Sequence, residues 1–152
     1  MNLDQYQPIE WIVVVGGREA KAYVRRQQEK IMPIIGNAPE RKRLTQVKEL
    51  VPVTHWQSEA YDRSDEGRYN GTAPQSIEPD HLARAIASGL NAAREKREFD
   101  SLTLVAQSPM LGRLKSLLDP KALHALRTAL PKDFSHYSRP ELLRQLERSH
   151  AA

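Results

Sequence analysis

The sequence predicts a single α/β domain, residues 1–152, in which helices flank a mixed central sheet. Three patterns indicate this class: a mostly β-branched run at 11–15, an amphipathic helical pattern over 79–96, and a strand pattern at 102–106 that leads directly into a further helix. A strand that feeds a helix is typical of βα units. With 152 residues, the chain has the length of one ordinary domain.

The N-terminal region predicts an antiparallel meander of three strands. The first strand covers residues 11–15 and ends at Gly16–Gly17, where a turn can begin. Alternating apolar and polar residues predict a second strand over 20–26, and residues 30–35 predict a third. We therefore expect a short turn at residues 27–29 between the second and third strands.

Residues 37–78 form a long polar excursion within the predicted domain. The stretch contains many polar residues and several prolines, and only Leu50, Val51 and Val53 indicate a further short strand. Loops of this length in compact domains are usually functional or mobile, or they contain elements that the pattern hides. The sequence leaves a functional excursion and a disordered one equally open.

The second half of the chain predicts a helix, a strand and a second helix in succession. The main helix has Pro79 at its first position and ends near Lys96. A strand over 102–106 follows, and Ser108 is expected to cap the next helix.

The C-terminal region carries one ambiguous segment and one clear helix signal. Residues 122–130 fit a helix through the spacing of their leucines, and they also fit a strand. Ser138 with Glu141 three residues later has the spacing of a capping box. The last helix is therefore expected to begin after Ser138.

Composition excludes several classes of function. The chain has no cysteine, which excludes disulfides, thiolate catalysis and cysteine-ligated zinc. Its 23 Lys and Arg exceed its 19 Asp and Glu by a modest margin, which permits contact with phosphate backbones without requiring it. The N-terminal residues lack the pattern of a secretory signal, and no apolar run approaches the ~20 residues of a membrane-spanning helix. We expect a soluble, cytoplasmic protein without membrane insertion.

Six segments occur along the chain in the order found in one bacterial family. They are Trp11–Val15, Ala20–Arg26, Gly36–Arg41, Ser64–Arg68, Asp100–Gly112 and Lys132–Asp133. Through them the chain resembles the family described as "protein required for attachment to host cells", over about Glu10 to Leu146. That family is in turn similar to the middle domain of archaeal and eukaryotic peptide-chain release factors.

The resemblance also implies an order of elements. It favours a strand over the later part of residues 122–130, which gives three strands, a helix, a strand, a helix, a strand and a helix, the order of a ribonuclease H-like sheet. A nuclease of that fold needs clustered carboxylates to hold two metal ions. This chain offers only Glu10 at the first strand and Gln107 after the fourth, and its five histidines lack close ligand spacing. We expect no metal site and no cofactor.

The first turn does not carry the catalytic loop of a release factor. Such a factor hydrolyses peptidyl-tRNA with a Gly-Gly-Gln loop, whereas here Gly16 and Gly17 are followed by Arg18. Arginine has no side-chain amide, and two glycines after a strand are typical of a tight hairpin. The resemblance therefore implies contact with RNA or the ribosome without peptide release, and no catalytic residue is expected.

Two basic clusters are candidates for phosphate contact. Arg94, Lys96 and Arg97 lie at the end of the main helix, where cations complement the helix dipole. The other cluster lies on the excursion and has no such structural explanation, which makes it the better candidate. Together with a later arginine, the predicted nucleic-acid-binding residues are Arg41, Lys42, Arg43, Lys48 and Arg68.

The resemblance also marks a set of family-motif residues. They are Asp62, Asp65, Glu66, Gly67, Arg68, Lys132 and Asp133. Gly67 beside Arg68 could present a guanidinium to a phosphate or carboxylate, while a solvated turn held by an acid–arginine pair is the structural alternative. Lys132 and Asp133 could pair with each other or with the surrounding chain.

We therefore expect a non-enzymatic cytoplasmic binding protein that contacts RNA or the ribosome. One alternative is a factor needed for attachment to host cells or surfaces, which acts directly or through regulation. A second alternative is a hydrolase that uses the loop from Asp62 to Arg68. Apolar edge strands could support a homo-oligomer, but the sequence specifies none.

Overall fold

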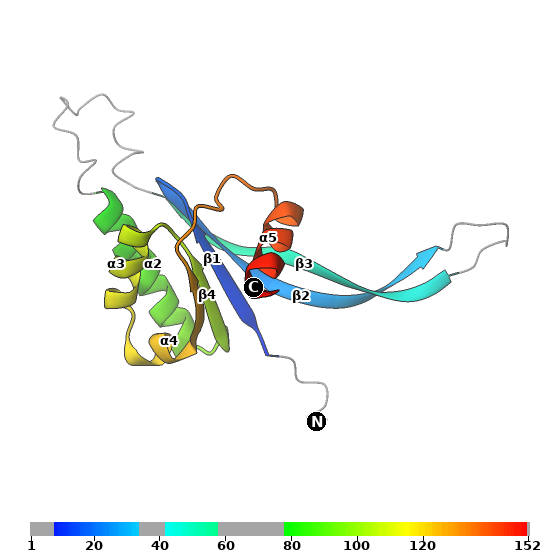
Figure 1. Cartoon of the computed structure of the whole chain (residues 1–152). Helices are drawn as coiled ribbons and strands as arrows, with labels where there is room; N and C mark the ends of the chain where they lie inside the picture. The colour runs from blue at the N-terminus through cyan, green and yellow to red at the C-terminus, as the bar shows by residue number, and fades with distance from the viewer. Residues whose placement is uncertain (1–7, 34–41, 58–77, 152) are drawn as a thin grey trace.

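A five-stranded mixed sheet forms the centre of the molecule (Figure 1). The computed structural model describes residues 8–33, 42–57 and 78–151. The strand order is β3-β2-β1-β4-β5, with antiparallel pairing of β1 to β2 and of β2 to β3, and parallel pairing of β1 to β4 and of β4 to β5. This arrangement confirms the predicted mixed α/β sheet. The elements are β1 (Glu10–Val15), β2 (Glu19–Pro33), β3 (Lys42–Gln57), α2 (Glu78–Glu95), β4 (Ser101–Val105), α3 (Ser108–Leu117), α4 (Pro120–Ala125), β5 (Leu126–Leu130) and α5 (Arg139–Ala151).

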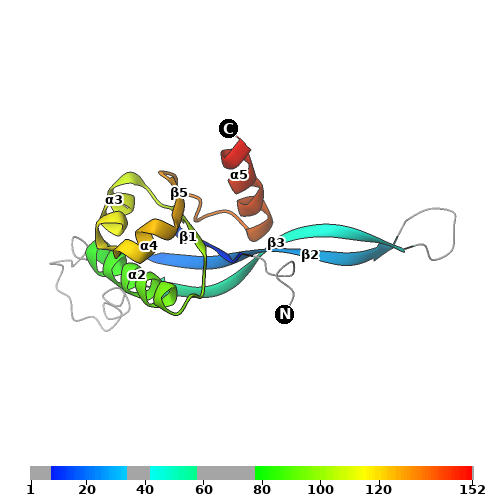
Figure 2. The ribbon, with the colours of Figure 1, turned by 90° about the horizontal axis from the view of Figure 1, so that it is seen from below.

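Strand β1 is buried on both faces because helices cover both sides of the sheet. Trp11, Val13 and Val15 belong to a first core with α2, α3 and α4, whereas Ile12 and Val14 belong to a second core with α5. The helices accordingly lie on opposite sides of the sheet, with α2, α3 and α4 together and α5 apart from them (Figure 2). Successive side chains of a strand alternate between its faces, so a continuous apolar run is what this central position requires.

Helix α2 packs along the first core with the face that the sequence predicts. Leu82, Ile86, Leu90 and Ala93 are all buried. Gly89 lets the helix approach edge strand β3 closely, because a Cβ atom there would lie 3.1 Å from the indole of Trp56. The packing of α2 therefore holds the end of β3 that carries Trp56 against the first core.

The structure corrects the prediction of a turn at residues 27–29. Strand β2 runs without a break from Glu19 to Pro33, and it pairs with β3 along its whole length. Residues 27–29 are Gln, Gln and Glu, and they include none of the glycine, proline, asparagine or aspartate residues that favour turns.

The structure also places a long strand inside the stretch predicted as a polar excursion. Strand β3 occupies Lys42–Gln57, far beyond the short signal at Leu50 to Val53. Residues 42–49 are mostly polar and lack the regular apolar alternation that identifies a half-buried strand in a sequence. The rest of the excursion, residues 37–41 and 58–77, lies outside the described residues.

Two helix starts in the C-terminal half differ in their capping. Ser108 is the first residue of α3 and not its cap, because the cap is the extended residue Gln107, which makes no side-chain capping bond. Helix α4 is capped by Asp119, whose Oδ1 accepts a hydrogen bond from the Ala122 amide at 2.9 Å. Residues 122–130 thus contain the end of α4 followed by β5, so the expected strand in their later part is confirmed.

The predicted start of the last helix is confirmed. Ser138 Oγ accepts a hydrogen bond from the Glu141 amide at 3.4 Å, and α5 begins at the next residue, Arg139. The Glu141 carboxylate accepts hydrogen bonds from Arg144 and Gln145. Within the described parts of the chain, none of the helices is long and apolar enough to cross a membrane.

Candidate functional site

Strands β2 and β3 continue beyond the sheet as a two-stranded ribbon (Figures 1 and 2). The pairing of β1 with β2 ends at Trp11 and Val24, whereas β2 and β3 remain paired as far as Pro33 and Lys42. We call residues 25–33 and 42–49 the basic ribbon. Its Lys and Arg residues are Arg25, Arg26, Lys30, Lys42, Arg43 and Lys48, and its acidic residues are Glu29 and Glu49.

Three of the predicted nucleic-acid-binding residues therefore lie on a strand and not on a loop. Lys42, Arg43 and Lys48 all belong to β3, where the backbone pairs Lys48 with Gln27 and Arg43 with Met32. The Lys48 side chain is 46% exposed, and its Nζ lies 3.4 Å from Glu147 Oε2 on α5. Arg41 and Arg68 lie outside the described residues.

The base of the ribbon is held by a charge network under α5. Arg25 Nε lies 3.1 Å from Glu10 Oε1, and Arg25 NH1 lies 3.6 Å from Glu147 Oε2. Thr103 Oγ1 donates a hydrogen bond to the other oxygen of Glu10 at 2.9 Å. Arg25 Nε forms no hydrogen bond with any of the described residues, although the Glu10 carboxylate is close to it. Its contact with Glu10 is therefore an ion pair. This network serves the structure, because it joins the beginning of β1 to β2, β4 and α5.

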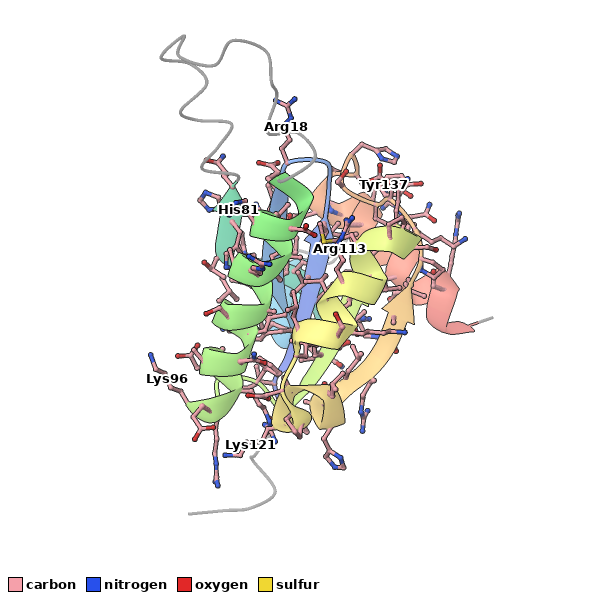
Figure 3. All side chains as sticks on the ribbon, turned by 90° about the vertical axis from the view of Figure 1, so that its left-hand side faces the viewer. Arg18, His81, Lys96, Arg113, Lys121 and Tyr137 are labelled. Atoms are coloured by element: carbon pink, nitrogen blue, oxygen red, sulfur yellow. The ribbon has the colours of Figure 1, made fainter. Side chains whose placement is uncertain are left out.

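The basic cluster at the end of α2 also has a structural role. Arg94 NH1 donates a hydrogen bond to the carbonyl of Phe99 at 2.7 Å, which ties the helix to the segment before β4. Figure 3 places Lys96 and Lys121 at the end of the molecule opposite to Arg18 and Tyr137. These cations therefore do not form one surface with the turn between β1 and β2.

The loop between β5 and α5 contains the motif residues Lys132 and Asp133, both exposed. Asp133 Oδ1 accepts hydrogen bonds from Ser135 Oγ at 2.6 Å and from the Ser135 amide at 3.1 Å. These bonds lower the pKa of Asp133, and the charge of His136 lowers it slightly further. The loop in turn packs on the first turn, because a Cβ atom at Gly16 would lie 3.0 Å from Ser135. Asp133 thus orders the loop that covers the end of β1.

The other motif residues cannot be placed relative to this loop. Asp62, Asp65, Glu66, Gly67 and Arg68 lie outside the described residues. In the described part of the chain, no three His, Asp or Glu side chains gather where they could hold a metal ion.

An open groove of about 670 Å³ lies between strands β2 and β3 and the beginning of α5. Sequence reasoning missed it because its residues come from three separate elements. The one local signal was Lys21, which lies between the buried residues Ala20 and Ala22 on β2, and whose cross-strand partner is His55. The groove's lining includes Glu19, Lys21, His55, Tyr137, Ser138 and Arg139.

Comparison with known proteins identifies one family. Residues 11–146 match the family model described as "Protein required for attachment to host cells". No curated protein matches the chain. The matched range begins in β1 and ends in α5, so it includes the basic ribbon, the groove and the loop before α5.

Proposed function

The chain belongs to the family of proteins required for attachment to host cells, and we propose that it is a non-enzymatic, cytoplasmic protein that binds the phosphate backbone of RNA. Family membership suggests a role in host attachment without specifying the molecule that is contacted. One observation carries the proposal: apart from Arg25, which is paired with Glu10 and Glu147, the projecting basic ribbon has five Lys and Arg residues against two Glu residues. Cations that neutralise phosphates release counterions, which is the main source of affinity in non-specific nucleic-acid binding.

The shape and exposure of the ribbon support this assignment. A two-stranded ribbon is one of the elements that proteins use to contact DNA, and contacts to phosphates do not require entry into a groove. Beyond its base beside α5, the ribbon extends away from the helices in both views (Figures 1 and 2), so a long polymer could reach this outer part without meeting the helices. Lys48 on the ribbon has a side chain that is about half exposed. The resemblance to release-factor middle domains favours RNA, and the ribosome as its source.

RNA binding is tested with a ribbon variant and a charge-matched control. The ribbon variant carries Lys42→Ala, Arg43→Ala and Lys48→Ala. The control carries Lys96→Ala in the turn after α2, Lys115→Ala on α3 and Lys121→Ala on α4. Fluorescence polarisation with a labelled single-stranded RNA should show about tenfold weaker binding for the ribbon variant only. Wild-type binding should also weaken as salt rises from about 50 to 200 mM.

Equal affinities of the ribbon variant and the control would contradict this site, and binding that does not respond to salt would contradict the phosphate contact. Sedimentation of the native protein in a sucrose gradient then identifies the source of the RNA. Co-migration with ribosomal particles at low salt, lost at higher salt, is the expected result.

A second function follows from the family description: a factor needed for attachment to host cells or surfaces. A deletion strain should attach less, and the wild-type gene should restore attachment. Complementation with the ribbon variant separates the two roles. If the variant restores attachment but does not bind RNA, attachment does not depend on the basic ribbon.

A further inference from the structure

We propose that the open groove between strands β2 and β3 and the beginning of α5 binds a small organic anion. This site lies at the opposite end of β2 from the basic ribbon, because it begins at Glu19 and Lys21 whereas the ribbon begins at Arg25. The inference does not depend on RNA binding, since the two sites share no residue.

The groove has the size and composition of a ligand site. Its volume of about 670 Å³ falls within the range of roughly 300–1,000 Å³ that is typical of small-molecule sites. Tyr23 and Pro52 line its sheet side, and Tyr137 lines its helix side. The Tyr137 ring is held in place by Phe134, with ring centroids 5.5 Å apart. Ring faces and a proline offer contact area to the apolar body of a ligand.

The charged groups around the groove favour an anion. Among the residues that line the groove, Lys21 and Arg139 are cations, His55 is a ring that can form hydrogen bonds, and Glu19 is the single acid. Lys21 and His55 are cross-strand partners, so their side chains lie side by side on one face. Lys21 Nζ is 3.9 Å from Glu19 Oε1, a long contact between two side chains that are each about half exposed. The lysine ammonium has three donors, so this contact leaves it able to bind a second carboxylate or a phosphate.

Arg139 brings a second cation to the groove from α5. One of its guanidinium nitrogens, NH1, donates a hydrogen bond to the Leu50 carbonyl at 3.5 Å, which anchors the side chain over β3. A guanidinium has five donors in a planar fork, and this geometry suits carboxylates and phosphates. The positive end of the α5 dipole lies at the same place, because Arg139 is the first residue of that helix.

The test is NMR titration of the full ¹⁵N-labelled chain with AMP, citrate and adenosine as probes. AMP or citrate should shift the amide signals of Lys21, Tyr23, His55 and Tyr137 in a saturable way, whereas adenosine, which has no charge, should not. Lys21→Glu and Arg139→Glu should each weaken binding by about tenfold or more. Lys115→Glu, an exposed change on α3, should leave it unchanged.

The proposal would be overturned by no saturable shift with AMP or citrate, by equal shifts with adenosine, or by equal binding of the groove variants and the Lys115→Glu control. Shifts confined to the ribbon, at Gln27 and Lys48, would also overturn it, because they would place the anion at the other site. Unchanged signals elsewhere in the spectra of the variants show that the fold is intact.

Discussion

At the scale of single residues, Glu147 connects the structure of the domain to its basic ribbon. Its carboxylate lies 3.6 Å from Arg25 NH1 and 3.4 Å from Lys48 Nζ. Arg25 is mostly buried, with its side chain 13% exposed, and a buried charge needs such a partner. Lys48 is exposed and does not need one for stability. Glu147 therefore pairs with Lys48, a cation that the RNA proposal assigns to contact with phosphate.

We expect Glu147→Gln to tighten RNA binding, because it removes a carboxylate that competes for Lys48 and repels phosphate. The gain should be about two- to fivefold at low salt and should shrink as salt rises. Glu141→Gln is the matched control on the same helix, since Glu141 pairs with Arg144 and Gln145 instead. Fluorescence polarisation with one labelled RNA checks both variants. Weaker binding by Glu147→Gln, or an equal gain in the control, contradicts the expectation.

Asp133 should make stability depend on pH in the acid range. Its pKa is lowered in the folded state, chiefly by its hydrogen bonds from Ser135, so the folded protein favours the ionised carboxylate. The stabilisation is present above the unfolded pKa of about 3.9 and is lost as the pH falls through the lower folded pKa. Asp133→Asn should therefore lower the free energy of unfolding by about 0.5 kcal/mol near neutral pH, a small effect because the group is exposed.

Urea unfolding of the wild type and Asp133→Asn at neutral pH and near pH 3 checks this expectation. The difference between the two proteins should shrink at the acid pH. A difference that stays constant or grows on acidification would show that the carboxylate does not stabilise the loop through its charge.

At the scale of elements, sequence reasoning succeeded where a strand or helix buries apolar side chains. The strand at 11–15 and the helix beginning at Pro79 were predicted because both bury apolar residues with a clear period. In the distal ribbon, the strand predicted over 30–35 is the end of β2 and not a separate third strand, and residues 42–49 of β3 were not predicted because they lack regular apolar alternation. The groove was missed for another reason: Lys21, His55 and Arg139 meet only through pairing and packing between elements.

Replacement of two helical glycines by alanine should have different effects on the free energy of unfolding. A Cβ at Gly112 on α3 would meet nothing within 4 Å, so Gly112→Ala should stabilise the protein by about 0.5–1 kcal/mol through helix propensity. A Cβ at Gly89 on α2 would lie 3.1 Å from the Trp56 ring, which would have to move. Gly89→Ala should therefore be less stable than Gly112→Ala by about 1 kcal/mol. Urea denaturation measures both, and equal gains would show that α2 and β3 are not packed this closely.

At the scale of the whole molecule, one sheet carries two cores of unequal size. The first is covered by α2, α3 and α4, whereas the second has α5 and the loop before it (Figure 2). Leu142 and Leu146 are the buried residues that α5 contributes to the second core. The attachment of α5 thus depends on few apolar contacts together with the ion pairs of Glu147.

Leu146→Ala should consequently destabilise the entire fold. The side chain is fully buried, and its loss should lower the free energy of unfolding by about 2–4 kcal/mol. Leu123→Ala is the control, because Leu123 on α4 is 41% exposed and should change stability by less than about 0.5 kcal/mol. Thermal and urea unfolding provide the measurement. If Leu146→Ala cost no more than the control, α5 would not be part of the cooperative unit.

The position of β1 in the sheet also has a consequence for synthesis. Its antiparallel neighbour β2 follows at once, whereas its parallel neighbour β4 begins only at Ser101. While the chain is being translated, one edge of β1 therefore keeps unpaired N–H and C=O groups until Ser101–Val105 has emerged. At about 5–20 residues per second this interval lasts several seconds. During that time the nascent chain presents an apolar strand edge, and this is when chaperones would protect it most.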